Sequence, residues 1–119
     1  SSTLYLLGYR IHQRLMISVT FVEKNGKFIS LEVKGHAGSG PYGHDLVCAA
    51  VSGILLGGLN NLQDGDQNYK SEVKEGHVYL EALKEVSEHD YIVLETIEKQ
   101  IESVASSYPK NVKLERKHK

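Results

Sequence analysis

One cysteine and one histidine in the first half of the chain could together carry out nucleophilic chemistry. Cys48 is the only cysteine in the 119 residues, and His36 precedes it by twelve positions. A thiol at the start of a helix is held closer to its thiolate form, because the unpaired backbone N–H groups there carry partial positive charge. An imidazole within reach could accept the thiol proton and later protonate a leaving amine. The pair therefore suggests Cys–His acyl transfer.

The segment around the cysteine predicts a helix from Asp45 to about Leu62. Asp45 would cap its N-terminus and place Cys48 in the first turn, where free N–H groups could also hold an oxyanion. Asp45 could instead orient the His36 imidazole, and the sequence leaves both roles open. Ser52 shares this helix face, and we interpret it as a small packing residue. Because the helix is apolar around most of its circumference, we expect it to be buried at the centre of the fold.

A glycine-rich segment connects the histidine to this helix. Its small residues are Gly38, Ser39, Gly40 and Gly43. With a proline among them, this composition excludes regular structure. Since glycine accepts backbone angles that a hinge requires, we expect the loop from Gly38 to Gly43 to close over a bound substrate.

Three other kinds of site fit these residues less well. Residues 38–43 match G-x-G-x-x-G, but the strand before them belongs to a hairpin rather than to a βαβ unit. His36, His44 and Cys48 could bind zinc in an open site, although their spacing matches no common zinc pattern. The loop could cradle an anion, but no Lys or Arg lies at residues 35–68 to assist it. We therefore expect no metal and no cofactor.

Composition favours a cytoplasmic protein of one domain. Apolar residues make up 40% of the chain and charged residues 24%, and the net charge of −1 provides no basic field for direct nucleic-acid binding. A single cysteine cannot form an intramolecular disulfide, which fits a reducing compartment. The longest apolar run, Leu46 to Leu59, is too short to cross a bilayer. We expect neither a membrane nor a nucleic acid as partner.

The remaining patterns predict the elements that must position the pair. Strands are expected at residues 17–23, 28–34, 69–74, 78–83 and 111–115. Asn25-Gly26 is a strong hairpin turn signal between the first two strands. A second amphipathic helix is expected at residues 87–108, with Ser87 and Asp90 resembling a capping box, and residues 60–68 are expected to be a polar loop. The order ββαββαβ predicts a single small α+β domain, with two helices against a mostly antiparallel sheet.

The first fifteen residues stand apart from this pattern. Residues 1–15 precede the only methionine, Met16, and lack a secretory signal. We interpret them as a cloning remnant or an upstream extension, and residues 16–119 as a single domain that carries the Cys–His pair. The alternative is a genuine first strand at residues 4–9.

The central residues resemble a known signature. Gly35-His36-Ala37, followed by Gly43-x-Asp45-Leu46-Val47-Cys48-Ala49-Ala50-Val51-Ser52, is similar to the signature of the bacterial ribosomal-processing cysteine proteases. The rest of the chain from Met16 also looks like that family. The resemblance implies a bacterial cytoplasmic endopeptidase that removes the N-terminal extension of large-subunit ribosomal protein twenty-seven, with Cys48 as nucleophile and His36 as its base. It also implies a homodimer and a mobile glycine loop. It leaves the role of Asp45 unsettled.

Two other functions stay open at this point. The chain could be a non-enzymatic ribosome-associated binding module, in which Cys48 is a packing residue and the glycine loop a docking surface. Fast alkylation of the thiol near neutral pH would distinguish an enzyme from such a module. The same pair could also serve an acyltransferase or a thioesterase, and an acyl thioester offered beside a ribosomal tail peptide would separate these activities.

Overall fold

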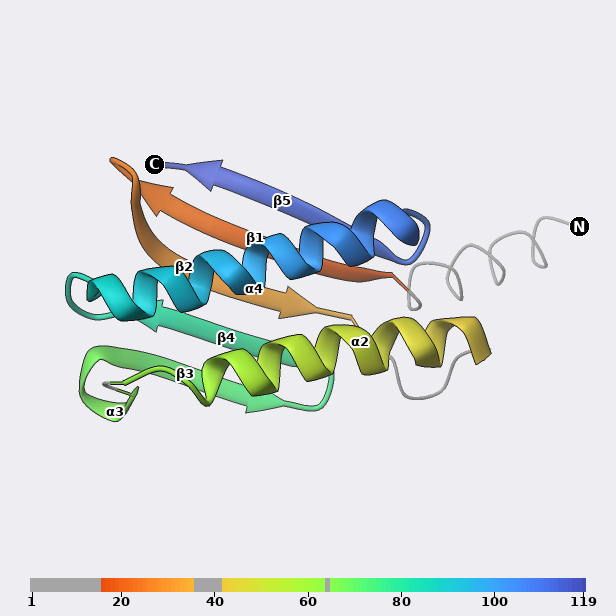
Figure 1. The fold of residues 1–119 in the computed structure, drawn as a ribbon, viewed down its shortest axis with the longest axis horizontal. Coiled ribbons are helices and arrows are strands. Elements are labelled where there is room, and N and C mark those ends of the chain that lie inside the picture. Colours follow the sequence, from red (N-terminus) through yellow and green to blue (C-terminus); the bar gives the residue numbers. More distant parts are fainter. Residues whose placement is uncertain (1–15, 36–41, 64) are drawn as a thin grey trace, which may run out of the picture.

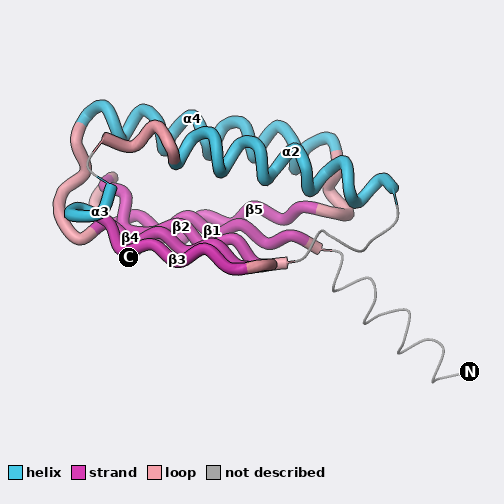
Figure 2. Tube along the Cα trace, turned by 90° about the horizontal axis from the view of Figure 1, so that it is seen from below, coloured by secondary structure: helices cyan, strands magenta, loops and turns pink. Residues whose placement is uncertain are grey.

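A five-stranded sheet and a layer of two long helices make up the part of the chain that the structure describes (Figures 1 and 2). This computed structural model describes residues 16–35, 42–63 and 65–119, with the backbone alone at residues 42–45 and 66. The strands are β1 (Ile17–Lys24), β2 (Lys27–Lys34), β3 (Tyr69–Lys74), β4 (His77–Ala82) and β5 (Val112–His118). The helices are α2 (Tyr42–Leu59), α4 (Glu88–Ser107) and the short α3 (Gly65–Asn68).

The sheet has the order β3-β4-β2-β1-β5 and is antiparallel except where β5 runs parallel to β1. The β1–β2 turn is at Asn25-Gly26, where both residues have positive φ (54° and 77°), the backbone that a tight hairpin requires. In the β3–β4 turn, Gly76 has a positive φ (76°) and Glu75 before it does not. The predicted fold class is confirmed. The loop expected at residues 60–68 is wrong in one respect, because its last residues form α3.

The core lies between the helices and one face of the sheet. Alternate residues of the strands point inward, as the pleat requires, and they meet one stripe of each helix. The buried apolar residues at its centre are Ile17, Val19, Phe21, Leu31, Val33 and Leu80 from the sheet, and Val47, Val51, Leu55, Leu94, Ile97 and Ile101 from the helices. The predicted amphipathic helix is confirmed as α4, with Leu94, Ile97 and Ile101 buried, and Ser87 caps it by accepting a hydrogen bond from the Asp90 amide.

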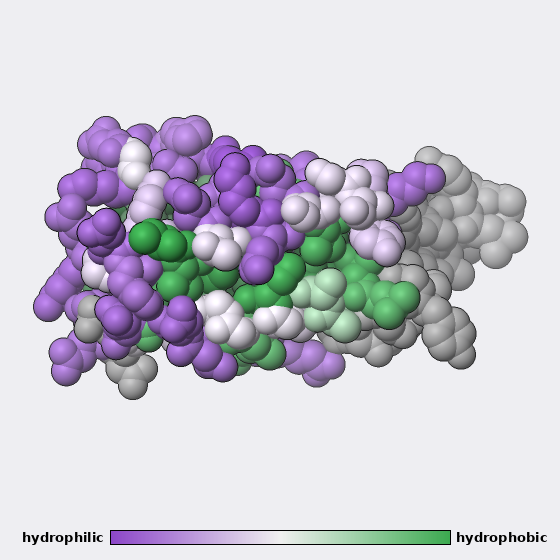
Figure 3. Space-filling view, viewed as in Figure 1, coloured by the Kyte–Doolittle hydropathy of each residue, from purple (hydrophilic) through white to green (hydrophobic). Residues whose placement is uncertain are grey.

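The expectation that α2 is buried at the centre is wrong. Among the α2 side chains that the structure describes (residues 46–59), only the Val47–Val51–Leu55 stripe is buried, and the other faces carry exposed apolar side chains, including Leu46 (69% exposed) and Leu56 (52% exposed). Figure 3 shows hydrophobic surface on the helix side of the molecule. A helix that is apolar all round has unused apolar surface when it packs in a two-layer fold, because only one side faces the sheet.

Two adjacent glycines near the end of α2 should respond oppositely to alanine. A Cβ at Gly58 would lie 2.5 Å from the Ile97 side chain of α4, whereas a Cβ at Gly57 would meet nothing within 4 Å. Alanine is favoured over glycine in a helix by up to about 1 kcal/mol. We expect Gly57→Ala to raise the free energy of unfolding by several tenths of a kcal/mol and Gly58→Ala to lower it. Urea denaturation of both variants tests this, and equal shifts of the same sign would contradict the close approach of α2 and α4.

A buried carboxylate fixes the start of α4 against the chain leaving α2. The Asp90 side chain is 1% exposed and accepts hydrogen bonds from the Tyr69 hydroxyl (2.9 Å) and the Gln63 amide (3.0 Å). His89 Nδ1 lies 2.9 Å from the same carboxylate. Burial alone would raise the pKa of Asp90, but the hydrogen bonds from His89, Gln63 and Tyr69 outweigh it and lower the pKa.

We expect Asp90→Asn to lower the free energy of unfolding by about 2 kcal/mol, since hydrogen bonds to a charged acceptor are lost. Because the folded pKa lies below the unfolded value, this stabilisation is present above the unfolded pKa and is lost as pH falls through the folded pKa. The variant should therefore lose part of the acid dependence of stability. Urea titrations between pH 2 and pH 7 measure it, with the exposed Glu88→Gln in the same helical turn as control; identical profiles for the two variants would refute the prediction.

Candidate active site

Cys48 lines a groove between α2 and the β3–β4 hairpin. The groove has a volume of about 330 Å³. On the helix side it is bounded by Cys48, Ser52 and Leu56, which follow one another at intervals of four residues and so share a helix face. The other wall is the hairpin segment from Val73 to Val78. Cys48 is half-buried and packs against the core, so its thiol stands where the core meets an open groove.

The helix that carries Cys48 begins earlier than predicted. Its first residue is Tyr42, so Asp45 lies inside the first turn and not at the capping position, and Cys48 is in the second turn. The capping role of Asp45 is therefore wrong, and the free N–H groups of the helix start precede the cysteine by one turn. Gly43 is likewise helical and not part of the loop. The sequence places Pro41 immediately before Tyr42, and proline is favoured where helices start. Pro41 was therefore a better signal of the helix start than Asp45.

Gly35 joins three segments at the end of the groove. It lines the groove, and its N–H donates to the Gly76 carbonyl (3.1 Å) in the β3–β4 turn. Its φ of +119° and its packing against Met16, whose carbonyl oxygen would lie 2.2 Å from a Cβ, both require glycine. The chain thus leaves β2 at the groove, and the next residue in the sequence is His36.

Several predicted site residues lie outside the described part of the chain. These are His36, Gly38, Ser39 and Gly40, and the side chain of Asp45. The pairing of His36 with Cys48 therefore stays a prediction. Within the described residues no cluster of three His, Cys, Asp or Glu side chains could hold a metal, and no described helix is long and apolar enough to cross a membrane. The zinc alternative stays untested because it includes His36.

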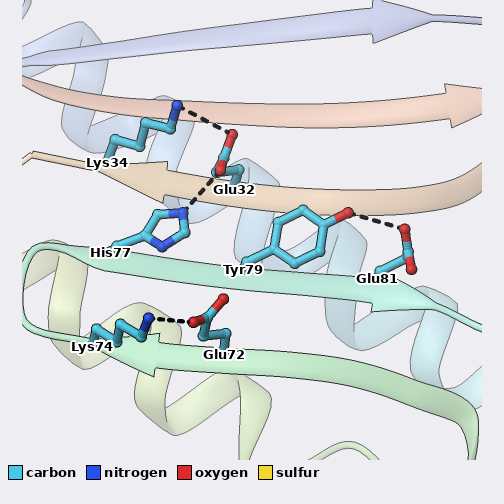
Figure 4. Close-up of polar contacts among 7 residues, drawn as sticks. All are labelled: Glu32, Lys34, Glu72, Lys74, His77, Tyr79 and Glu81. Atoms are coloured by element: carbon cyan, nitrogen blue, oxygen red, sulfur yellow. Dashed lines mark hydrogen bonds and ion pairs between the residues drawn. The ribbon is translucent and has the colours of Figure 1, made fainter.

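His77 is the histidine that the described residues place at this groove. Its Nε2 lies 2.8 Å from Glu32 Oε2, and the other carboxylate oxygen, Glu32 Oε1, lies 3.8 Å from Lys34 Nζ. Figure 4 shows these side chains together on the face of the sheet away from the helices. The strand register gives the same orientation for His77. The neighbouring pair Val33 and Val78 points inward to the groove and the core, and adjacent residues of a strand point to opposite faces. The His77 imidazole is therefore engaged on the far face and is not a base for Cys48.

The groove walls include residues that sequence reasoning missed or misassigned. Ser52 is exposed and lines the groove, so its interpretation as a packing residue is wrong. Leu56 and Val73 present exposed apolar side chains from opposite walls. The one signal in the sequence was Val73, an apolar residue in an otherwise polar strand (YKSEVK).

Lys74, which lines the groove, is paired with Glu72 of the same strand. Lys74 lies 2.6 Å from Glu72, and both side chains are largely exposed. The hydrogen bond and charge of Lys74 lower the pKa of Glu72, and those of Glu72 raise the pKa of Lys74. Because the charge of Lys74 is neutralised by Glu72 and most of the lining residues are apolar, the groove offers mainly apolar contacts to a ligand.

Comparisons with known proteins agree on one family. The family model of cysteine protease Prp matches residues 16–113. The ribosomal processing cysteine protease Prp of Staphylococcus aureus is 30% identical over 105 residues, which cover 83% of this chain and 97% of that protein. The protein of the same name from Mycoplasma genitalium is 28% identical over 82 residues, covering 69% and 82%.

Solved structures give the same result. SMU.848 from Streptococcus mutans superposes with a TM-score of 0.72 at 29% identity, covering 87% of this chain and 96% of that one. The essential ribosomal processing protease Prp from S. aureus, in complex with a covalently linked product peptide, superposes with a TM-score of 0.72 at 27% identity, covering 86% and 100%. The family match spans strands β1 to β4, both long helices and all the residues that line the cysteine groove. This chain therefore belongs to the cysteine protease Prp family and is a cysteine protease.

Proposed function

We propose that this protease removes the N-terminal extension of large-subunit ribosomal protein twenty-seven in the bacterial cytoplasm. The observation that carries the proposal is the position of the Cys48 thiol, which lines an open, mainly apolar groove bounded by Ser52, Leu56 and Val73. An apolar groove suits an extended peptide tail. The relatives' name, ribosomal processing cysteine protease, and the S. aureus protein's complex with a substrate peptide support this class of substrate.

In the proposed mechanism His36 accepts the Cys48 proton and the thiolate attacks the scissile carbonyl carbon. The tetrahedral intermediate expels the amine, which takes the proton from His36, and leaves a thioester on Cys48. Water, deprotonated by His36, then hydrolyses the thioester, releasing the carboxylate and restoring the thiol. Asp45 would orient His36, since a position inside α2 is incompatible with capping. Gly38, Ser39 and Gly40 would close over the substrate.

We also propose that the enzyme is a homodimer. The exposed Leu46 of α2 and Ile92 of α4 (56% exposed) lie on faces of these helices that the described sheet does not cover. A groove of about 610 Å³ between these two helices is lined by Gly53, Ile54, Ile92 and Val93, among others. Such apolar surface is typical of an interface. Sedimentation velocity at several concentrations gives the mass; a monomer throughout would reject the dimer.

The function is tested with purified ribosomal protein twenty-seven carrying its N-terminal extension. Incubation followed by intact mass analysis should show one new species, shorter by the extension. An acyl thioester and an unrelated peptide of equal length serve as parallel substrates. Hydrolysis of the thioester alone would favour a thioesterase. No reaction of any substrate, together with slow alkylation of Cys48 at neutral pH, would favour the non-enzymatic binding module.

A further inference from the structure

Strand β3 forms a free edge of the sheet beside the cysteine groove. It is the outermost strand on its side, paired only with β4 among the described residues. Figure 2 looks onto this edge, with β3 in the foreground and α2 in the helix layer above it. All of its residues after Tyr69 are exposed. It has neither a proline nor a β-bulge against β4, two features by which proteins block an edge strand.

The register decides which backbone groups point outward. Leu83 N–H donates to the Asn68 carbonyl (2.8 Å), and antiparallel pairs alternate between bonded and non-bonded along the ladder. Lys70, Glu72 and Lys74 therefore bond to β4. Ser71 and Val73, opposite Leu80 and Val78, direct their N–H and C=O groups away from β4, to the free edge.

The side chains of the same two residues face the helix layer. Ser71 and Val73 oppose the inward-pointing Leu80 and Val78, and Val73 lines the groove although 62% of it is exposed. The α2 residues across the groove are Leu56, Ser52 and, one turn further, Cys48. One short segment thus offers unpaired backbone groups and an apolar contact next to the thiol.

We propose that the substrate binds as an added strand along β3, with its backbone bonded to Ser71 and Val73. Every second substrate side chain would then enter the groove beside Leu56 and Val73, since side chains of a strand alternate between faces. Backbone bonding brings the scissile bond to Cys48, and the apolar contacts select the sequence. This inference rests on the proposed peptidase function and specifies how its substrate is held.

Amide hydrogen exchange tests the added strand without relying on turnover. The probe is the uncleaved tail peptide of ribosomal protein twenty-seven, bound to Cys48→Ala. Without peptide the amides of Ser71 and Val73 should exchange rapidly, while those of Glu72 and Lys74 are protected by β4. Saturating peptide should slow Ser71 and Val73 at least about tenfold, as expected for amides that enter a sheet ladder. Binding without this protection would overturn the proposal.

N-methylation of the peptide gives an independent result. Single N-methyl groups at successive substrate positions should raise KM in an alternating pattern, because only every second amide faces β3. Cleavage by the unmodified enzyme with a flat N-methyl profile would overturn the added strand and leave the proposed function standing. Failure to cleave the unmethylated peptide would count against the function itself. Protection of Ser71 and Val73 without peptide, rising with protein concentration, would assign the edge to a second copy and overturn the proposal.

Discussion

Replacing Cys48 by alanine should abolish peptide cleavage and leave the fold intact. The proposed mechanism has no other nucleophile, and removing the nucleophile of a covalent protease lowers kcat by roughly 10⁴-fold or more. The fold should survive because Cys48 is only half-buried and alanine is a good helix former. Cys48→Ser should fail similarly, since a hydroxyl is far less ionised than a thiol. Steady-state kinetics and circular dichroism melting measure the two effects.

Ser52→Ala is the matched control for this prediction. Ser52 lies one turn from Cys48 on the same groove wall, so its replacement changes the same surface without removing the nucleophile. It should keep turnover within a few fold of the parent. His36→Ala should lose turnover and still bind the peptide. Full activity in Cys48→Ala would refute the mechanism outright.

Gly35→Ala should destabilise the protein strongly and impair catalysis. A Cβ there would lie 2.2 Å from the Met16 carbonyl oxygen and 2.9 Å from the Ile17 Cα, and both atoms are backbone that cannot rotate away. The φ of +119° adds strain for any L residue. We expect the free energy of unfolding to fall by about 2–4 kcal/mol. Activity should fall as well, because Gly35 bonds to Gly76 at the groove and directly precedes His36.

Gly26→Ala separates the effect of backbone strain at a positive φ from the effect of a steric clash of the added Cβ. Gly26 also has positive φ (+77°), but a Cβ there meets nothing within 4 Å, and the turn is in the β1–β2 hairpin, outside the residues that line the groove. It should lose about 1 kcal/mol and keep full activity. Equal losses of stability in the two variants, measured by urea denaturation, would show that the contact of Gly35 with Met16 is unimportant.

The sequence was sufficient for most of the fold because its local signals were strong. Asn25-Gly26 fixed the first hairpin, and the spacing of Leu94, Ile97 and Ile101 gave α4 its buried stripe. The parallel pairing of β5 with β1 was not predicted, since two strands far apart in the chain carry no local mark of their partnership. The exposure of α2 was missed for a related reason: periodicity shows which side can be buried, not how much surface is covered.

The site was less predictable than the fold. Cys48 could be singled out by its residue type and neighbours, but the groove wall opposite it comes from residues 73–78, which no motif connects to the cysteine. Asp45 was misplaced because two start signals, an aspartate and an earlier proline, compete within one turn. The alternation of Ser71 and Val73 became meaningful only when the strand order showed β3 at the edge.

The place of β5 bears on how this enzyme is made. Among the described residues the last strand pairs with the first, and Arg116 on β5 also bonds to Glu98 and Glu102 of α4. Contacts between segments so distant in sequence slow folding, because a long loop must close before they form. In a nascent chain that still lacks β5, β1 would be an exposed edge strand. We therefore expect the complete sheet to form only after β5 has been synthesised.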